Sequence, residues 1–332
     1  MSGKIKSANA DSVLEAADLL GQGKLVAFPT ETVYGLGANA LNGKAVARIF
    51  EAKGRPNFNP LIVHLKDASS ASEYVEMDQR AKKLAAHFWP GPLTMILPRS
   101  LNCEISELCS AGLPTLAVRV PSGSTALSLL KSCNFPIAAP SANSSGQLSP
   151  TAPKHVNESL GDKVDMILAS GSCSVGLEST VLDLSGKTPV ILRPGAITDK
   201  DIEEVLEEKV TYELEVKNDN PKSPGQLLRH YAPRIALRLN AVDLESNEAL
   251  LAFGSDKFMG IKGGGSAKDL PDYAHRNLSE SGYLEEAASN LFKMLHELDT
   301  DKNASIAVMS IPDQGLGIAI NDRLKRAAES KK

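Results

Sequence analysis

Short apolar stretches alternate irregularly with segments of helical periodicity in the first part of this chain, and this order restricts its fold more than any other feature. Strictly alternating strands and helices would predict a parallel sheet, whereas an irregular order favours a twisted mixed sheet covered by helices. Helices are predicted at 42–53, where Asn42 can act as the N-cap, near 79–88 and near 123–132. The predicted strands lie at 25–28, 61–63, 94–97, 116–118, 137–138, 166–168 and 180–182.

The last third of the chain predicts a second, smaller α/β domain. One helix is expected at 198–207, and the following stretch to Pro233 contains Asn, Pro and Gly residues but no clear apolar period, which is typical of a linker. Strands at 235–239, 249–253 and 305–309 and helices near 282–298 and 315–328 follow. We therefore predict a first α/β domain at 8–196, a linker at 197–233 and a C-terminal α/β domain at 234–330.

The composition indicates two ordinary domain cores. The chain has 332 residues, of which 42% are apolar. No apolar run reaches the roughly 18 residues of a membrane span, and the N-terminus lacks the apolar segment of a secretory signal. We therefore expect a cytoplasmic protein that does not bind a membrane. Four cysteines without metal-ligand spacing are expected to be buried reduced thiols, and they are Cys103, Cys109, Cys133 and Cys173.

The charge argues against a protein that binds nucleic acid through broad phosphate neutralisation. The formal net charge is −4. Residues 1–196 carry 18 Lys and Arg against 16 Asp and Glu, a net charge of +2, whereas residues 197–332 carry 18 against 24, a net charge of −6. A small anionic ligand is compatible with the first part. Tight direct binding of nucleic acid is expected of neither.

Two short strings far apart in the chain carry the clearest chemistry. In the first, Lys53 and Arg55 flank Gly54, and we expect both on a polar loop outside the core. An ammonium and a forked guanidinium suit phosphate oxygens, although cations also stabilise a helix C-terminus. The second string, Ala-Pro-Ser-Ala-Asn at 139–143, offers small polar donors. If the fold joins the strings, they form an anion site without the common nucleotide-binding glycine motifs, which are absent.

These strings belong to an ordered set of six motifs that resembles the YrdC family from Ala8 to about Gly195. The motifs are Phe-Pro-Thr-Glu-Thr-Val-Tyr-Gly-Leu-Gly at 28–37, Lys53-x-Arg55, Phe-Trp-Pro-Gly-Pro-Leu-Thr at 88–94, Arg-Val-Pro at 119–121, Pro-Ser-Ala-Asn at 140–143 and Ser-Thr-Val at 179–181. The extension, with Ser-Pro-Gly-Gln at 223–226 and His-Tyr-Ala-Pro at 230–233, is similar to the Sua5 form of that family. The resemblance implies a YrdC-like mixed sheet and a Sua5-type C-terminal domain.

The resemblance also implies the site residues. The positions that match the catalytic set of the nucleotide cleft are Lys53, Arg55, Ser141 and Asn143. Those that match ATP-binding residues are Arg55, Asn59, Thr115, Ser141, Ser149, Arg193 and Tyr231, the last on a linker that closes over the cleft. Those that match threonine-binding residues are Thr32, His64, Arg119, Ala139 and Ser179. Taken alone, His64 is typical of a strand, and Thr115 and Ser149, each beside a proline, are typical of turns.

The activity that the resemblance implies is the synthesis of threonylcarbamoyl-AMP and pyrophosphate from L-threonine, bicarbonate or CO2, and ATP. Mg²⁺ would be bound through phosphate oxygens, with no metal ligand from protein side chains. The product would serve the t6A modification at position 37 of tRNAs that read ANN codons, through a separate transferase complex. Two alternatives stay open. One is an RNA-binding or ribosome-associated module, and the other is carbamoyl transfer for hydrogenase maturation, against which the missing acylphosphatase-like and zinc-finger segments argue.

Overall fold

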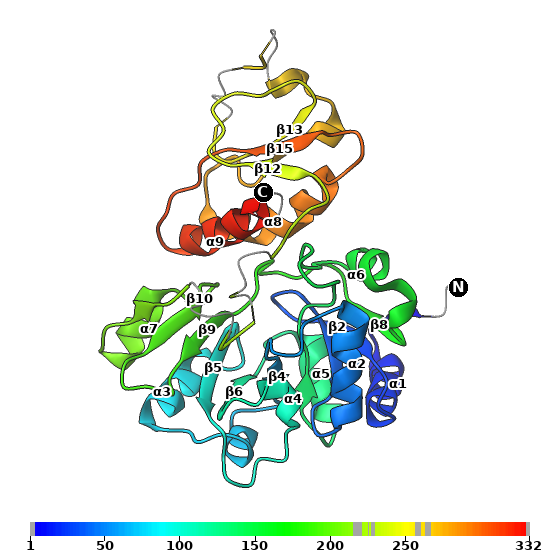
Figure 1. Cartoon of the computed structure of the whole chain (residues 1–332), viewed down its shortest axis with the longest axis vertical. Helices are drawn as coiled ribbons and strands as arrows, with labels where there is room; N and C mark the ends of the chain where they lie inside the picture. Colours follow the sequence, from blue (N-terminus) through cyan, green and yellow to red (C-terminus); the bar gives the residue numbers. More distant parts are fainter. Residues whose placement is uncertain are drawn as a thin grey trace. The chain divides into compact units, whose positions relative to one another are not determined.

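The structure is a computed structural model that describes residues 4–214, 221–224, 226, 230–255, 260–262 and 267–329. The chain forms two compact units (Figure 1). Unit 1 contains residues 4–145, 149–174 and the described residues from 178 to 226. Unit 2 contains residues 146–148, 175–177 and the described residues from 230 onward. Two short segments, which lie before the rest of unit 2 in the sequence, therefore belong to the second unit.

Unit 1 is built on a sheet whose described strands follow the order β1-β8-β2-β3-β7-β4-β6-β5-β9-β10-β11. Half of the neighbouring pairs are parallel and half are antiparallel, which confirms the predicted mixed sheet. The strands are β1 (Ile5–Ser7), β2 (Val26–Pro29), β3 (Tyr34–Asn39), β4 (Ile62–His64), β5 (Leu93–Pro98), β6 (Thr115–Arg119), β7 (Ile137–Ala138), β8 (Met166–Ala169), β9 (Thr180–Asp183), β10 (Val190–Arg193) and β11 (Thr211–Tyr212).

Helices cover both faces of this sheet. Successive strand residues point to opposite faces, so Val26 and Phe28 of β2 pack with α1 and α5, whereas Ala27 lies in the cluster that contains the apolar side of α2. The helices are α1 (Ala10–Gly21), α2 (Gly43–Lys53), α3 (Gln79–Phe88), α4 (Glu107–Ser110), α5 (Ser124–Ser132), α6 (Pro153–Leu160) and α7 (Asp199–Leu206), with 3-10 turns η1 (Ser69–Glu73) and η2 (Gly161–Lys163).

The local sequence explains why α2 begins and ends where it was predicted. The side chain of Asn42 accepts hydrogen bonds from the N–H groups of Lys44 and Ala45, which have no partner inside the helix. Gly54 follows the helix with a φ of 60°, a left-handed conformation that glycine adopts without a side-chain clash. Lys53 is therefore fixed as the last residue of the helix.

Part of the predicted linker is regular structure of unit 1. α7 starts after Thr198, which forms a capping box with Asp201, and packs against α3. β11 pairs with β10 where no strand was predicted. The two residues of β11 are exposed and show no apolar pattern, because pairing at a sheet edge needs only main-chain groups. Residues 215–220, 225 and 227–229 of the predicted linker lie outside the described residues.

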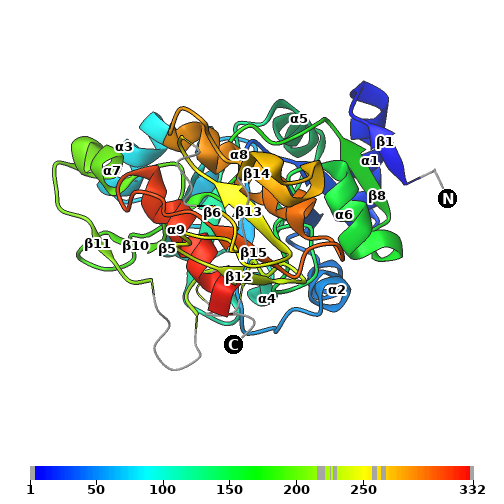
Figure 2. The same ribbon diagram turned by 90° about the horizontal axis from the view of Figure 1, so that it is seen from above.

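Unit 2 contains a parallel sheet in the order β12-β15-β13-β14, and α8 and α9 pack against it (Figure 2). This arrangement confirms the predicted second α/β fold. A side chain at Gly176 would lie 2.4 Å from the main-chain oxygen of Ser289 in α8, so only glycine lets the 175–177 segment approach this helix. The elements are β12 (Ala236–Arg238), β13 (Glu248–Ala252), β14 (His275–Asn277), β15 (Ser305–Val308), α8 (Leu284–Leu298) and α9 (Leu316–Glu329), with 3-10 turns η3 (Ala267–Asp269) and η4 (Asp272–Ala274).

The cysteines are unpaired. Cys109, Cys133 and Cys173 are buried, and burial raises the pKa of each thiol to about 12, as expected of inert structural thiols. Cys103 is only partly buried. In the part of the chain that the structure describes, no helix combines the length and the apolar character needed to cross a bilayer.

Candidate functional site

Lys53 joins the two strings that the sequence analysis singled out. Its Nζ donates to the main-chain oxygens of Ser141 at 2.6 Å and Asn143 at 2.5 Å, and its own main-chain oxygen accepts from the N–H of Ser145 at 2.8 Å. Lys53 is only 3% exposed, so the expectation that it lies on a polar loop outside the core is wrong. Burial, and then the charge of Arg55, lower the pKa of Lys53 well below its usual value. Lys53 therefore fixes the second string beside the end of α2.

Arg55 is also buried, and it holds the loop that follows α2. Its Nε donates to the main-chain oxygen of Asn59 at 3.2 Å, and its Nη2 donates to that of Pro60 at 2.8 Å. The side chain of Asn59 is buried, and neither its oxygen nor its nitrogen has a hydrogen-bond partner among the described residues. A buried amide in this state costs free energy unless a ligand pairs with it. Asn59 therefore suits a polar ligand, and its assignment to ATP stays a prediction.

The second string is anchored on β3. Ser141 forms an isolated bridge with Gly35, and the N–H of Ala142 donates to the main-chain oxygen of Tyr34 at 2.8 Å. Asn143 is buried, whereas Ser141 is partly exposed. Ser141 therefore lies partly exposed on a loop that both β3 and Lys53 hold in place.

A buried guanidinium lies at the centre of the predicted threonine site. In the parallel pair of β4 and β6, His64 stands opposite Arg119. Nε of Arg119 donates to the main-chain oxygen of Gly91 at 3.0 Å, Nη1 to Oγ1 of Thr32 at 3.0 Å and Nη2 to Oε1 of Glu31 at 2.5 Å. The structure thus brings together Thr32, His64 and Arg119, three residues that the sequence analysis assigned to threonine.

His64 is a neutral side chain in these surroundings. Burial first, and then the charge of Arg119, lower its pKa from 6.5 to about 3. Its ring meets that of Phe28 edge-on, with centroids 6.2 Å apart, and its Nδ1 has no hydrogen-bond partner in the described part of the chain. A neutral imidazole offers a hydrogen bond but no charge. His64 is therefore suited to a small polar group such as a hydroxyl, and not to an anion.

Ser179, which was predicted to bind threonine, contacts Arg193, which was predicted to bind ATP. Nη2 of Arg193 donates to Oγ of Ser179 at 3.1 Å, and Nε and Nη2 donate to its main-chain oxygen at 3.1 and 3.0 Å. Oγ1 of Thr94 lies 2.8 Å from the same Oγ. Ala139, which directly follows β7, is buried, and its N–H donates to the main-chain oxygen of Ile62 on β4 at 2.9 Å.

Three residues predicted to bind ATP have other surroundings. Thr115 is the first residue of β6, at the opposite end of the strand from Arg119. Ser149 donates the hydrogen of its hydroxyl to the buried carboxylate of Glu178. Tyr231 belongs to unit 2, where its ring packs against that of Phe292 with centroids 5.5 Å apart. The assignment of these three residues to ATP stays a prediction.

Glu31, Thr94 and Glu178 were not predicted from the sequence, although all three are buried polar side chains in contact with predicted site residues. Glu31 and Thr94 stand inside two of the quoted motifs, and Glu178 directly precedes a third. Charged and hydroxyl side chains next to matched positions were the signal that could have identified them. Within the described residues, no three His, Cys, Asp or Glu side chains gather closely enough to hold a metal ion.

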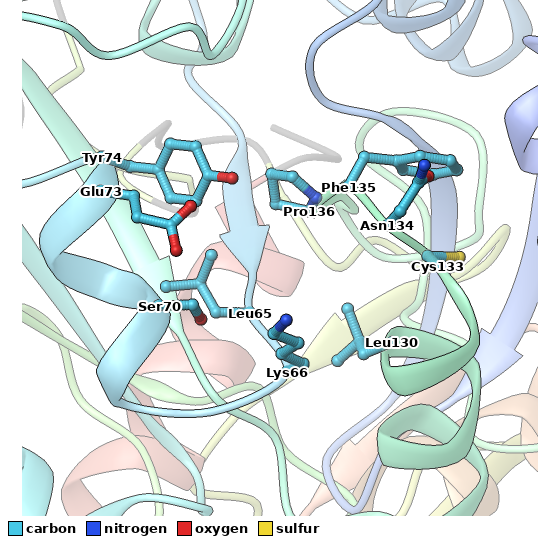
Figure 3. A pocket seen from close by; sticks show the side chains of 10 residues that line it. All are labelled: Leu65, Lys66, Ser70, Glu73, Tyr74, Leu130, Cys133, Asn134, Phe135 and Pro136. Carbon is cyan, nitrogen blue, oxygen red and sulfur yellow. The ribbon is translucent and has the colours of Figure 1, made fainter.

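A separate cavity lies beyond the end of β4. Figure 3 shows Ser70, Glu73 and Tyr74 on one side of it and Leu130 and Cys133 on the other. Its volume of about 70 Å³ has room for two or three water molecules at roughly 30 Å³ each, and is too small for a nucleotide. None of the predicted site residues lines this cavity. It is therefore distinct from the two clusters around Lys53 and Arg119.

The mixed sheet with its buried cations, together with the parallel α/β unit, defines a two-domain α/β protein of the YrdC type. Residues 18–195 match the family model for Sua5, YciO and YrdC, which is described as "Telomere recombination". Residues 197–329 match the model for the C-terminal domain of threonylcarbamoyl-AMP synthase. The chain belongs to the Sua5/YrdC family, and this confirms the resemblance found in its motifs.

Relatives cover nearly the whole chain. It is 42% identical to the threonylcarbamoyl-AMP synthase of Pyrococcus abyssi over 328 residues, which span 94% of this chain and 93% of the relative. It is 40% identical to that of Bacillus subtilis over 331 residues, which span 97% and 94%. A crystal structure of P. abyssi Sua5 complexed with L-threonine is similar with a TM-score of 0.86 and 36% identity, covering 99% of this chain and 97% of that chain.

Proposed function

We propose that this chain is a threonylcarbamoyl-AMP synthase, a nucleotidyltransferase that forms threonylcarbamoyl-AMP and pyrophosphate from L-threonine, bicarbonate or CO2, and ATP. The observation that carries the proposal is similarity over both units: two relatives of that name are 40% and 42% identical over more than nine tenths of the chain. The product would supply the activated group for the t6A modification at position 37 of tRNAs that read ANN codons.

L-threonine is the amino acid substrate. The similar P. abyssi structure is a complex with L-threonine. In this chain, the guanidinium of Arg119 suits the carboxylate of the substrate, because its fork can donate two parallel hydrogen bonds. The neutral imidazole of His64 and the hydroxyl of Ser179 suit the substrate hydroxyl. Thr32 and Ala139 complete the proposed threonine site.

The reaction joins two steps. The threonine amine adds to CO2 and loses a proton, which gives a carbamate. A carbamate oxygen then attacks the α-phosphorus of ATP, and the bond to pyrophosphate breaks. Such a displacement depends on positioning and on compensation of the negative charge of the phosphates, without a covalent enzyme intermediate.

The two strings supply that positioning and charge. Lys53 acts through the loop that it holds by the main-chain oxygens of Ser141 and Asn143, to which its buried Nζ donates. Arg55 adds a buried cation, and the buried amide of Asn59 offers a donor and an acceptor. We assign ATP to Arg55, Asn59 and Ser141 first. The assignments of Thr115, Ser149, Arg193 and Tyr231 to ATP belong to the same proposal.

Mg²⁺ would enter as part of the ATP complex. We assign the ion to phosphate oxygens of ATP and propose no ligand to it from protein side chains. A separate complex would transfer the threonylcarbamoyl group to tRNA. A cytoplasmic location remains a proposal too.

The test measures pyrophosphate release together with incorporation of labelled bicarbonate carbon into threonylcarbamoyl-AMP. Product should form only when threonine, bicarbonate, ATP and Mg²⁺ are all present. If the chain is instead an RNA-binding module, RNA affinity should fall steeply with salt and should not respond to threonine. Release of pyrophosphate that does not depend on threonine would contradict the proposed activity.

A further inference from the structure

Glu31 is a buried carboxylate beside the proposed threonine site. One of its oxygens accepts from Nη2 of Arg119 at 2.5 Å, and the other accepts from the main-chain N–H of Gly123 at 3.3 Å. The side chains of Glu31 and Arg119 are 8% and 3% exposed. Burial alone would raise the pKa of Glu31, but the charge of Arg119 and the hydrogen bonds hold it below its usual value of 4.5. Glu31 is therefore ionised at neutral pH, and it is too weak a base to take the proton of the threonine ammonium.

The contacts of Arg119 leave a defined part of its guanidinium for a ligand. Of the five N–H donors of a guanidinium, three are used by Gly91, Thr32 and Glu31. Thr32 is itself held, because its hydroxyl lies 2.7 Å from Oγ1 of Thr30. Among the described residues, one N–H on each Nη atom is then left without a protein acceptor. A carboxylate can bind such a pair with two hydrogen bonds.

We propose that Glu31 is a positioning residue of the threonine site, which fixes the plane of the Arg119 guanidinium so that its two remaining N–H groups bind the carboxylate of threonine. This inference rests on the proposed function. Glu31 also offsets the charge of Arg119, and His64 is neutral, so these three groups carry no net charge together. A substrate with both an ammonium and a carboxylate suits such a site, because neither of its charges meets an uncompensated protein charge.

Glu31 also supports the start of α5, and the test has to separate the two roles. A side chain at Gly123 would lie 3.0 Å from the main-chain nitrogen of Glu31, so the turn before α5 packs tightly on this segment. Loss of the carboxylate therefore removes an acceptor from Gly123 as well as from Arg119. A change of stability alone would not report the proposed role.

The experiment compares the binding of L-threonine and L-threoninamide to the full-length protein by calorimetric titration. Threoninamide replaces the carboxylate by an amide of the same shape. In Glu31→Gln and Glu31→Ala we expect the affinity for threonine to fall at least fivefold, and the preference for threonine over threoninamide to fall by at least the same factor. If both ligands weaken in proportion, or if neither weakens in a folded variant, the positioning role is wrong.

Two further variants complete the design. Glu15→Gln removes a carboxylate whose ion pair with Lys6 is exposed, and it should change neither affinity nor preference. Arg119→Lys keeps the charge but loses the fork, so its preference for threonine should fall as in the Glu31 variants. Unchanged threonine binding in Arg119→Lys would contradict the proposed threonine site itself. Unchanged binding in the Glu31 variants alone would leave that site in place and remove only the positioning role. Thermal melting identifies the folded variants, and Glu31→Gln, which keeps the size and one acceptor oxygen, decides the question if Glu31→Ala does not fold.

Discussion

Arg193 donates to both the hydroxyl and the main-chain oxygen of Ser179, so a residue assigned to ATP and a residue assigned to threonine form one hydrogen-bonded unit. The chain around them is close-packed. A side chain at Gly195 would lie 2.4 Å from the main-chain nitrogen of Thr180. The segment after β10 therefore packs directly against the start of β9. A change at Arg193 therefore has to affect the proposed threonine site as well as the nucleotide.

Arg193→Lys should raise the KM for both ATP and threonine by at least about fivefold, because an ammonium cannot reproduce the fork of donors to Ser179. Steady-state kinetics with each substrate varied in turn measure both constants. Arg234→Lys, at a largely exposed side chain, is the matched control and should leave both unchanged. A rise in the KM for ATP alone would separate the two sites.

Lys53→Ala should lower adenylate formation by at least tenfold and should also destabilise the protein. Its ammonium is bonded to two main-chain oxygens, and loss of the donor leaves these acceptors unpaired, which costs about 1–3 kcal/mol of unfolding free energy. Urea unfolding and pyrophosphate release measure the two effects. Lys44→Ala, exposed at the start of the same helix, is the control. Wild-type pyrophosphate release from a folded Lys53→Ala would remove this residue from the mechanism.

Threonine should be selected over valine by a larger factor than over serine. A site that hydrogen-bonds a hydroxyl leaves buried polar groups unpaired when valine enters, whereas serine loses only a methyl group, worth about 1 kcal/mol. Values of kcat/KM for the three amino acids test this order. Comparable values for valine and threonine would contradict the assignment of Thr32, His64 and Ser179.

His64 should make the protein less stable as the pH falls below 6.5. Its pKa in the folded state is about 3, so between pH 6.5 and 3 the unfolded chain binds a proton that the folded chain excludes. The unfolding free energy should then fall with decreasing pH by up to about 1.4 kcal/mol per pH unit. Urea unfolding between pH 5.5 and 6.5 measures this slope above the pH at which the unfolded carboxylates begin to bind protons. The slope should be smaller in His64→Gln than in the wild type, whereas the exposed control His87→Gln should keep the wild-type slope. Equal slopes in the wild type and both variants would contradict burial of a neutral imidazole.

Local patterns were sufficient to predict much of the fold. Asn42 and Gly54 mark the two ends of α2 through main-chain chemistry that is visible in the sequence. β3 was not predicted, because Gly35 and Gly37 have no β-branched side chains to indicate a strand. They are required by close packing instead: a side chain at Gly37 would lie 2.9 Å from the ring of Phe28. Such a contact across the sheet leaves no periodic signal.

The site was only partly predictable for a similar reason. The motifs identified Lys53, but the charge pattern suggested exposure, whereas its ammonium is buried against main-chain oxygens of Ser141 and Asn143, far away in the sequence. Main-chain acceptors are the same for every residue type, so no sequence pattern could indicate them. The pairing of Glu31 with Arg119 likewise depends on how β6 meets the loop after β2.

Unit 2 is not formed by one continuous stretch of the chain. Residues 146–148 and 175–177 are part of its fold, and Gly176 fits against α8 only because it has no side chain. A chimera that took everything after the linker from one relative and everything before it from another would therefore combine this helix with a foreign 175–177 segment. The segments 146–148 and 175–177 and the C-terminal part of the chain have to match one another for this unit to stay intact. A recombination at a single point near the linker would separate the two segments from the rest of the unit.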